Sequence, residues 1–465
     1  MASQRLAVAT VLVGSFLATL NIASVSIALP TLTDEFGVGV DGGKLVVVGY
    51  VATVTLLLIP FGRLGDMLGR RRFYAAGFLL FAVGATLCSV ASGLWQLVAF
   101  RVLQAFGAAM LIAQGSALIA AVVPAGQRGQ ALGWQVVAVA LGSTSGNVLG
   151  GFLTDALGWR SVFWTNAPVA ALGVVLALRV LPRGLRTPGS FDARGAALLM
   201  LAIGLVVAAA NVATPSAPWL GLPPLAAATV VLALFVRQQA RSAGPLLAAP
   251  LRRSRVFLGG IFAALFGFTA SVSGTFLAPF LLQKAMGLPP RLAGLAMLAY
   301  PVSVSLCSPL SGRLSDRIGG RVPATAGLLA IALGLVALGF LRPDSPVWLA
   351  SLFLAILGVG IGLFASPNNN AVFHAAPREH LGVANGMLGT MRNLGVTLGA
   401  SLASLVFVLS APGHVQPADP DAFVAAMRPA LWLGAGFAVV AALLSLARGA
   451  HRATETEPLS ASETT

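Results

Sequence analysis

Residues 62–72 read GRLGDMLGRRR, a charged stretch that separates two long apolar runs. The flanking residues 45–61 and 73–92 are almost wholly apolar, so we interpret the stretch as a tight loop between two membrane helices. Residues 312–321 repeat the pattern as GRLSDRIGGR further along the chain. The loop and its copy therefore predict a membrane protein built from two related halves.

Composition sets the fold class. Apolar residues make up 57% of the 465 residues, and charged residues make up only 9%. A soluble domain could not cover that much apolar surface with so few charges, so we predict an all-α polytopic membrane protein. A spanning helix needs about 20 apolar residues. This criterion predicts fourteen spans, at residues 6–30, 43–61, 73–92, 97–123, 130–153, 161–181, 193–213, 219–236, 257–282, 291–311, 322–341, 346–366, 383–410 and 424–447.

The charges are distributed unevenly along the chain. The net charge is +15, and a strongly positive charge is also found in proteins that bind nucleic acid. If the N-terminus is cytoplasmic, however, 21 Lys and Arg residues fall in cytoplasmic segments and six fall outside. This bias follows the positive-inside rule and favours contact with anionic membrane lipids. We expect a multi-pass protein of the plasma membrane, with both termini cytoplasmic and no nucleic-acid partner.

Neither the chain ends nor the cysteines indicate another class. Arg5 precedes an apolar run that is too long for a signal peptide, so we interpret the run as an uncleaved first helix. Cys88 and Cys307 fall in predicted spans and imply no disulfide and no metal site. Residues 448–465 are polar, and we expect a disordered cytoplasmic tail there.

The repeat extends beyond the charged loop. The ALP at residues 28–30 ends the first span, and the LAP at residues 277–279 ends the ninth. The first six spans thus correspond to the last six in the same orientation, as a parallel repeat about an axis along the membrane normal. We expect six-helix bundles over residues 6–181 and 257–447, separated by two inserted central helices with basic linkers over residues 182–256.

Three further stretches carry motifs. They are RVLQAFGAA at 101–109, a glycine-rich run at 142–151, and WRSVFWTNAP at 159–168. With the charged loop and the two bundles, they resemble the helix-4, helix-5 and helix-6 motifs of the major facilitator superfamily. The two extra helices narrow the resemblance to its fourteen-span drug:proton antiporters, which include multidrug and antibiotic exporters. The chain departs from these motifs at Ala105, where Gly is usual, and at Asn147, where Pro is usual.

The resemblance implies that the charged loop is a conformational latch, which holds the two bundles in the outward-facing state. The residues that carry this role would be Gly62, Asp66, Gly69 and Arg70, with Gly312, Asp316 and Gly319 in the second copy. Glycines at these positions permit close approach and sharp turns. The alternative is an ordinary positively charged loop, which the second copy disfavours.

Arg101 falls within the fourth predicted span and Arg392 within the thirteenth. A cation at the bilayer centre costs about 2.5–3.5 kcal/mol on insertion scales, so each arginine needs a partner or a wet cavity. Gln104 shares a helix face with Arg101. The resemblance implies a part in proton coupling for this helix-4 pair. Snorkelling of the arginines to the membrane interface is the alternative.

Glycines recur at helical spacing in two matching spans. They are Gly142, Gly146 and Gly150 in the fifth span, and Gly395 and Gly399 in the thirteenth. Such ladders let helices touch closely. We interpret them as the sliding contact between the two bundles, with generic helix packing as the alternative.

All fourteen acidic residues fall in loops, at span ends or in the tail. The antiporters that the chain resembles usually carry an Asp in helix 1, and here Asn21 stands at that place. An amide cannot bind and release a proton, which argues against proton coupling through this position and against cationic substrates. The side chains left to line a substrate cavity are neutral or basic: Asn21, Gln104, Asn147, Gln283, Tyr300, Asn369 and Arg392.

Two further stretches leave alternatives open. Asp34 and Glu35 are candidates for proton pickup from outside, although an ordinary solvated loop fits them better. Residues 366–370, SPNNN, would either cap the twelfth span or form part of a cytoplasmic gate.

We hypothesise a monomeric secondary transporter that exports small amphipathic, drug- or antibiotic-like compounds by alternating access, coupled to protons. It would need no cofactor and no metal, and its partners would be the substrate, protons and membrane lipids. The alternatives are a non-transporting sensor or scaffold, a relative with different coupling, and an exporter of an endogenous metabolite. A membrane enzyme would need a paired acid and base or a metal cluster, and the sequence has no HExxH motif and no Cys/His cluster.

Overall fold

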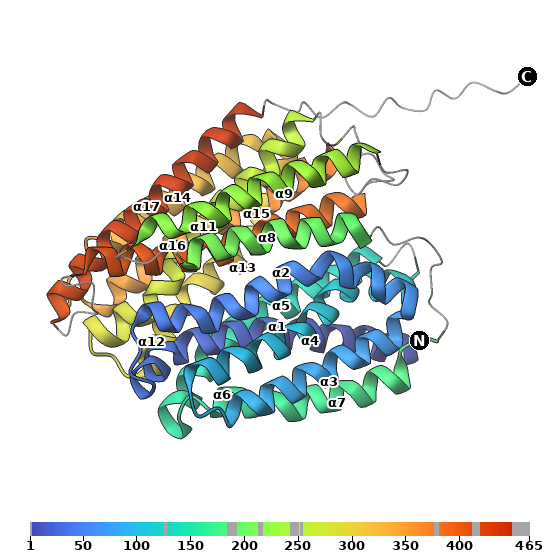
Figure 1. The fold of residues 1–465 in the computed structure, drawn as a ribbon, viewed down its shortest axis with the longest axis horizontal. Coiled ribbons are helices and arrows are strands. Elements are labelled where there is room, and N and C mark those ends of the chain that lie inside the picture. Colours follow the sequence, from blue (N-terminus) through green and yellow to red (C-terminus); the bar gives the residue numbers. More distant parts are fainter. Residues whose placement is uncertain are drawn as a thin grey trace, which may run out of the picture.

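The computed structural model describes residues 2–124, 128–183, 193–212, 217–241, 251, 254–375, 381–411 and 419–448. Within these ranges, fourteen helices are long and apolar enough to cross a membrane, and each predicted span coincides with one of them. The helices run side by side along the long axis of the molecule (Figure 1). The tail beyond residue 448 and most of the two linkers lie outside the described residues.

The N-terminal half consists of the first six spans. They are α1 (Ala2–Glu35), α2 (Val40–Leu68), α3 (Arg70–Ser89), α4 (Leu94–Val122), α5 (Arg128–Leu157), and α6 (Ser161–Trp164) continued by α7 (Asn166–Val180). In this half, α1 packs against α5, α2 packs against α4, and α3 packs against both α4 and α7.

The C-terminal half repeats these pairings. Its elements are α11 (Arg255–Phe280) with the π-helical turn η3 (Leu281–Ala285), α12 (Pro290–Met297), α13 (Ala299–Ile318), α14 (Arg321–Leu338), α15 (Val347–His374), α16 (Leu381–Ser410) and α17 (Pro420–Ala447). Here α11 packs against α16, α13 against α15, and α14 against both α15 and α17. The repeat of a six-helix unit that the sequence predicted is therefore present as equivalent helix packing in the two halves, and not only as similar loops.

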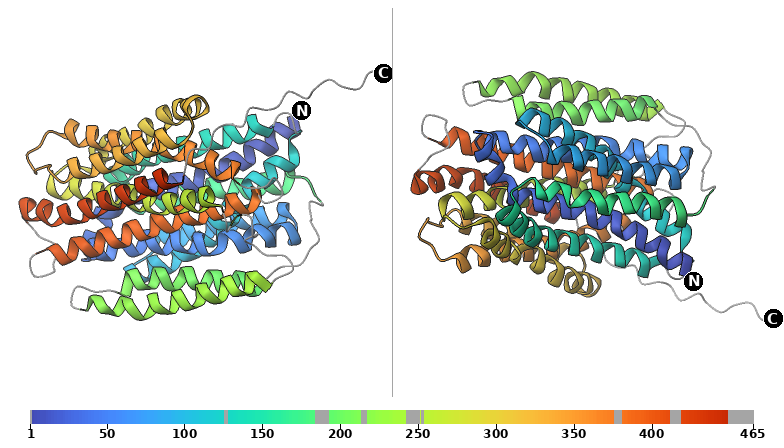
Figure 2. Two further views of the ribbon diagram at one scale, coloured as in Figure 1. Left: turned by 90° about the horizontal axis from the view of Figure 1, so that it is seen from above. Right: turned by 90° about the horizontal axis from the view of Figure 1, so that it is seen from below.

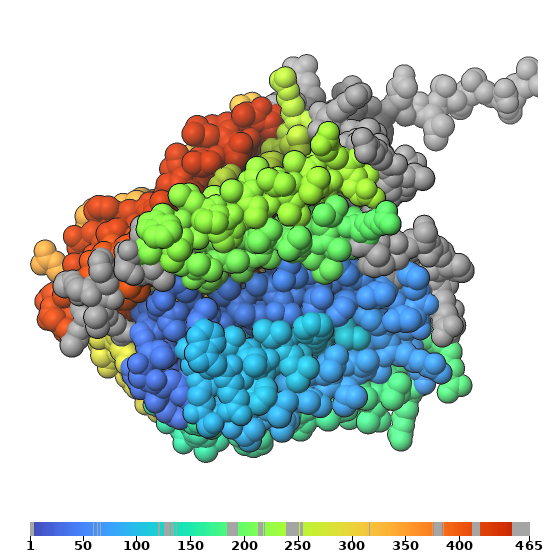
Figure 3. Space-filling model, viewed as in Figure 1, coloured from blue at the N-terminus to red at the C-terminus, as the bar shows by residue number. Residues whose placement is uncertain are grey.

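The two inserted helices are central in the sequence but peripheral in space. They are α8 (Ala193–Val212) and α9 (Leu222–Arg241), with the short 3₁₀ helix η2 (Pro218–Gly221) between them. α8 contacts α2 of one half and α16 of the other, whereas α9 packs mainly against α8. Figures 2 and 3 show this pair along one side of the molecule, over the line where the halves meet. α8 therefore covers one seam between the halves.

We call the end of the molecule at which α1 ends and α2 begins the distal end, and the opposite end, where α1 begins, the proximal end. The distal end lies at the left of Figure 1 and the N-terminus at the right. The turns between α2 and α3 and between α13 and α14 lie at the proximal end.

The charged stretch is mostly helical rather than a loop. α2 continues through Leu68, and the chain turns at a single residue, Gly69, whose φ is +102°. The second copy turns at Gly319, whose φ is +82°. Both values lie in the region that glycine adopts without strain. The predicted loop was too long because the end of an apolar run marks the membrane boundary, while helical hydrogen bonding continues beyond it.

The glycines before the turn differ in their surroundings. A Cβ on Gly62 would meet nothing within 4 Å, but one on Gly65 would overlap the side-chain amide of Gln114. The Gln114 amide donates hydrogen bonds to the carbonyl oxygens of Phe61 (3.1 Å) and Gly62 (2.7 Å) and so fastens α4 to α2. The close approach therefore occurs at Gly65. Nothing is described of the Asp66 and Asp316 side chains, so their latch role stays a prediction.

Candidate functional site: two arginine clusters and a polar seam

The buried polar residue with the largest side chain in the N-terminal half is Arg101, the eighth residue of α4. Its side chain is 1% exposed and lies about 10 Å along the helix from the first residue of α4. Nη1 donates to Asn21 Oδ1 at 2.5 Å and to Gln104 Oε1 at 2.8 Å, and Nε donates to the Val46 carbonyl oxygen at 3.3 Å. These inward contacts exclude the snorkelling alternative for Arg101.

Two aromatic rings complete the surroundings of the Arg101 guanidinium. The guanidinium carbon lies 4.0 Å from the ring centroid of Tyr50 on α2 and 5.7 Å from that of Phe163. We call Arg101, Asn21, Gln104 and Tyr50 the Arg101 cluster. It brings together the two residues predicted for the helix-4 motif, Arg101 and Gln104, and two predicted for the cavity, Asn21 and again Gln104. Tyr50 was not among the predicted site residues, although the chain has only three tyrosines and this one lies inside a predicted span.

The Arg101 cluster is incompletely paired. Within the described chain, Arg101 makes no ion pair with a carboxylate. Three buried polar atoms beside it also have no partner there: Asn21 Nδ2, Gln104 Nε2 and Tyr50 Oη. A buried cation without a counter-charge and buried donors without acceptors are both costly. The cluster therefore has a combination that purely structural sites rarely keep.

The C-terminal half contains a second buried arginine with an amide partner. Arg448, directly after α17, donates from Nη1 to Asn368 Oδ1 at 2.5 Å and from Nη2 to Ser445 Oγ at 3.0 Å. The Asn368 amide donates in turn to the Gly260 carbonyl oxygen at 3.1 Å, and Thr325 bonds to Ser445. Burial and the nearby Arg321 lower the pKa of Arg448 to about 10. We call Arg448, Asn368, Ser445 and Thr325 the Arg448 cluster.

This cluster decides the role of residues 366–370. α15 runs through them to His374, so they do not cap a helix at its end. Asn368 is 1% exposed and ties α15 to α11 and α17. It therefore fastens helices of one half together. Asn369, predicted for the cavity, is partly buried and makes no hydrogen bond within the described chain.

The glycine ladders pack helices within each half and do not form a sliding contact between the halves. A Cβ on Gly142 would lie 2.6 Å from the Phe16 carbonyl oxygen, and one on Gly146 would lie 2.6 Å from that of Leu20. Gly150 likewise faces Ser24, so all three face α1. Gly395 and Gly399 face α11 in the same way. The matching positions reflect the repeat, since each ladder fastens equivalent helices.

The contact between the halves at the glycine-rich run involves other residues. A Cβ on Gly151 of α5 would lie 2.7 Å from the Pro290 carbonyl oxygen, and one on Gly294 of α12 would overlap the backbone oxygen of Asn147. Asn147 is thus buried at the seam between α5 and α12. The sequence could not distinguish these glycines from the ladder because neighbouring positions on one helix face different partners.

Polar ties join the two halves at the distal end. Lys284 of η3 pairs with Asp34 of α1, and Gln283 donates to the Ile27 carbonyl oxygen at 2.9 Å. Arg291 lies 4.0 Å from Asp155. We call these contacts, with the Asp41–Ser404 bond described next, the distal ties. In the part of the chain that the structure describes, no hydrogen bond or ion pair joins the halves at the proximal end.

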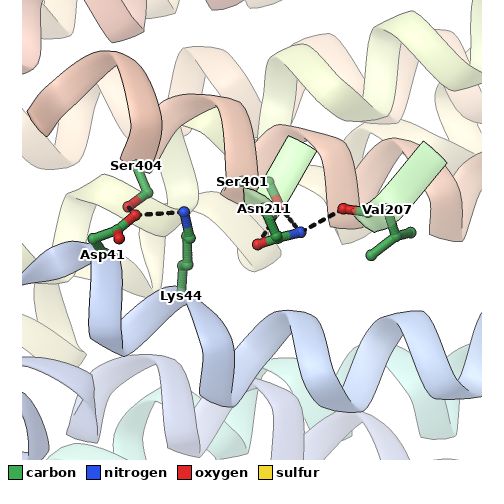
Figure 4. Close-up of polar contacts among 6 residues, drawn as sticks. All are labelled: Asp41, Lys44, Val207, Asn211, Ser401 and Ser404. Atoms are coloured by element: carbon green, nitrogen blue, oxygen red, sulfur yellow. Dashed lines mark hydrogen bonds and ion pairs between the residues drawn. The ribbon is translucent and has the colours of Figure 1, made fainter. Parts of the chain in front are cut away.

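Figure 4 shows the seam under α8. Ser404 of α16 donates to Asp41 at 3.2 Å, and Asp41 also pairs with Lys44, whose side chain is 3% exposed. One turn earlier on α16, Ser401 exchanges hydrogen bonds with Asn211 of α8 (3.1 and 3.4 Å). The inserted helix thus bonds directly to the helix that crosses the seam. Lys44 and Lys284 are the only lysines in the sequence, and their rarity could have indicated that both take part in polar contacts at the distal end.

Glu35 has a different role from Asp34. It accepts hydrogen bonds from Trp159 Nε1 at 2.7 Å and from Arg160 Nη1 at 2.6 Å, and Arg160 also donates to the Ala91 carbonyl oxygen. The helix-6 motif therefore closes the distal end of the N-terminal half. Since Asp34 and Glu35 are both ion-paired, neither is the simple solvated loop residue that fitted best from the sequence.

The remaining predicted cavity residues do not form one site. Tyr300 lies 3.1 Å from Ser271 Oγ, within the C-terminal half. The Arg392 side chain, near the middle of α16, is exposed and has no hydrogen bond or ion pair within the described residues. Arg392 therefore keeps both alternatives, a wet cavity and snorkelling.

The described part of the chain contains no group of three or more His, Cys, Asp or Glu side chains that could hold a metal ion. An apolar groove of about 420 Å³ lies between α3 and α7, lined by residues such as Val83, Leu87 and Pro168. It shares no residue with either arginine cluster.

Comparison with known proteins agrees with this architecture. The model of the Major Facilitator Superfamily matches residues 11–400 and, again, residues 259–463. The riboflavin transporter RibZ of Clostridioides difficile is 30% identical over 93% of this chain and 95% of its own length. The multidrug resistance protein Stp of Mycobacterium tuberculosis is 33% identical over 88% of this chain and 77% of its own.

Among solved structures, a POT family transporter in complex with 5-aminolevulinic acid superposes with a TM-score of 0.71 at 15% identity, covering 95% of each chain. That likeness supports the fold alone. The relatives are mostly fourteen-span drug:proton antiporters, and the family consists of transporters and not enzymes. With two like-oriented six-helix halves and fourteen spans, the chain belongs to the Major Facilitator Superfamily of secondary transporters.

Proposed function

We propose that this transporter exports small amphipathic, drug- or antibiotic-like compounds by alternating access. The observation that supports the mechanism is the position of the distal ties: among the described residues, the printed hydrogen bonds and ion pairs between the equivalent halves lie at the distal end. Two rigid units joined at one end open at the other when they rock. Each half is internally fastened by a glycine ladder and a buried arginine, so it moves as a unit.

The charge bias supports an orientation of the transporter in the membrane. If the proximal end is cytoplasmic, as the excess of Lys and Arg indicates, the distal ties close the extracellular end and the transporter faces inward. In that state a compound enters the central chamber from the cytoplasm or the inner leaflet. Breaking the ties then releases it outside, which is the order of events that an exporter requires.

The charges of the site favour neutral or anionic substrates. Arg101 and Arg392 place positive charge within the spans, and Asn21 provides an amide beside Arg101 where a carboxylate would attract cations. A cationic drug would meet a net positive field without a compensating carboxylate. We therefore propose that uncharged or acidic compounds are exported in preference to dications.

Flux into proteoliposomes tests the proposal. Purified protein is reconstituted, and uptake of neutral, anionic and dicationic fluorescent compounds is followed under an imposed pH gradient and, separately, an imposed potential. We expect uptake of neutral or anionic compounds that responds to the pH gradient. Absence of transport of every compound under both gradients would contradict the proposed function, whereas preferential uptake of dications would contradict only the charge selection.

A second candidate substrate follows from the comparison with RibZ. Because that relative is a riboflavin transporter and matches over nearly the whole chain, a flavin or a similar neutral heterocycle is a candidate for the same set of neutral and basic side chains. Riboflavin is included in the flux panel as an endogenous metabolite. Saturable riboflavin transport without transport of the drug-like compounds would favour this candidate.

A non-transporting sensor or scaffold is distinguished in cells. An efflux-deficient host is compared with hosts that express wild type, Asp66→Asn or Arg101→Ala, by compound accumulation and by growth in the compounds. We expect both variants to lose the resistance that wild type confers. A sensor would retain its response in Arg101→Ala and would confer no resistance in any form.

A further inference from the structure

The Arg101 cluster has a positive charge and hydrogen-bond donors but lacks the acceptor that would complete it. We propose that it binds one small monovalent anion, either a halide or the carboxylate of an organic acid, beside Asn21 in place of a carboxylate side chain. Such binding concerns the folded protein and can be measured without transport, although a substrate's own carboxylate would also supply the anion under the proposed function.

The charge of Arg101 is not compensated by a carboxylate within the described chain. The Arg101 guanidinium is 1% exposed, and its bonding partners within the described chain are neutral: Asn21, Gln104 and the Val46 carbonyl. The aromatic face of Tyr50 at 4.0 Å adds a partial negative field but no charge. A buried cation is stabilised best by an anion with hydrogen-bonding geometry, and the described residues supply none to Arg101.

Hydrogen-bonding groups of the cluster also lack partners within the described chain. A guanidinium carries five N–H groups, and the bonds that the structure gives to Arg101 leave from Nε and Nη1. Asn21 Nδ2, Gln104 Nε2 and Tyr50 Oη are also buried without a partner. Two of these atoms are donors only, and the third can donate. A bound anion would accept hydrogen bonds from such donors and would also neutralise the guanidinium, whereas a neutral acceptor would leave the charge uncompensated.

The Arg448 cluster shows that this deficit is not general to buried arginine–asparagine pairs. There the same 2.5 Å bond joins Arg448 Nη1 to Asn368 Oδ1, but the asparagine amide is bonded to Gly260 and Nη2 is bonded to Ser445. None of its side-chain atoms is among the buried unpaired ones. Unpaired donors therefore distinguish the Arg101 cluster, and only this cluster calls for an added anion.

The position of the cluster also suits an occluded ion. Its members come from α1, α2 and α4, and Asn21, Tyr50, Arg101 and Gln104 are each exposed by no more than 1%. An anion held there cannot exchange until one of these helices moves. We therefore expect slow exchange and a preference for small anions over bulky ones.

The test uses purified full-length protein in detergent, with the melting temperature Tm read from tryptophan fluorescence. At constant ionic strength, sodium gluconate is replaced stepwise by sodium chloride, bromide, acetate or benzoate. The polyhydroxylated chain of gluconate makes it the bulky reference. We expect a saturable rise in Tm of roughly 1–3 °C for the small anions, as ligand binding to the folded state requires.

Matched variants identify the site. Asn21→Asp places a carboxylate 2.5 Å from the bonded nitrogen of Arg101, so we expect a higher Tm in gluconate and no further rise with small anions. Asn368→Asp makes the same change beside Arg448 and should retain the anion effect. Tyr50→Phe removes one unpaired group and should weaken the effect without abolishing it.

The outcomes separate the sources of the anion and the two proposals. A response to halides alone assigns the site to a free ion, and a response to carboxylates alone assigns it to organic acids, so each supports the proposal. An equal Tm in all salts, or an undiminished anion effect in Asn21→Asp, overturns it. Proteoliposome flux in the same salts reports the proposed function separately, because export can persist without the anion effect and the anion effect can persist without export.

Discussion

Each half of this transporter contains a buried arginine beside an asparagine, but the hydrogen bonding around the two arginines differs. In the C-terminal half, Arg448 meets Asn368 and Ser445, and the asparagine amide is bonded to Gly260. In the N-terminal half, Arg101 meets Asn21 and Gln104, but both amide nitrogens remain unpaired. A paired cluster stabilises one packing arrangement, while an unpaired one gains stability only from a ligand or a movement. The comparison indicates that the Arg448 cluster is structural and the Arg101 cluster is functional.

The largest expected effect separates the two arginines. Hydrogen bonds to charged groups contribute about 1.5–3 kcal/mol, which corresponds to roughly a 10–100-fold change in an equilibrium. We expect Arg101→Ala to reduce flux per folded molecule by about that factor and Arg448→Ala to leave it nearly unchanged. Proteoliposome flux normalised to monodisperse protein measures both. Equal loss of flux in the two variants would break the comparison.

The asparagines provide a second contrast, in stability. Asn368→Ala removes two hydrogen bonds and leaves Arg448 partly unpaired, so we expect a loss of about 1–3 kcal/mol and a clear fall in Tm. Asn21→Ala removes one bond from an amide that is already half unpaired, and its Tm should fall less. Thermal unfolding in gluconate is the measurement. A larger fall for Asn21→Ala contradicts the assignment of a structural role to the Arg448 cluster.

A third contrast concerns the two glycines before the α2–α3 turn. Gly65→Ala would displace Gln114 and weaken its two bonds to α2, for which we expect a cost of about 1–2 kcal/mol. Gly62→Ala meets open space within a helix and should be neutral or stabilising by about 0.5–1 kcal/mol. The two single variants differ only in position, so their difference in Tm isolates the packing. Equal values would show that Gln114 moves aside freely.

The smallest expected effect concerns the distal ties. The Lys284–Asp34 pair is partly exposed, and such pairs contribute about 0–1 kcal/mol, which is at most roughly a fivefold shift between conformations. Spin labels are placed at Trp134 and Leu310, and the distance between them is measured. We expect Lys284→Ala to shift this distance toward its value in the opposite conformational state. Arg160→Ala breaks an ion pair within one half and serves as the control, with no shift. A shift in Arg160→Ala alone would place the conformational control in the helix-6 motif.

Much of the fold followed from the sequence because it depends on local chemistry. The number of long apolar runs predicts the number of spans, and the repeated charged stretch around Asp66 and Asp316 indicates how the halves are related. Positive-φ glycines were foreseeable at Gly69 and Gly319, since each precedes a new helix. The polar character of the helix-4 motif around Arg101 and Gln104 was also evident, because a charge inside a span needs a partner.

Tertiary structure decided which partner each residue meets. Gly142 and Gly151 lie on one helix, yet the first packs within its half and the second against the other half, because a helix presents different faces to different neighbours. Asn21 and Asn368 are both single asparagines in apolar spans, and only the packing around them pairs one amide and leaves the other unpaired. Sequence determines which groups enter the membrane, whereas the three-dimensional arrangement of helices determines whether their hydrogen bonds are satisfied.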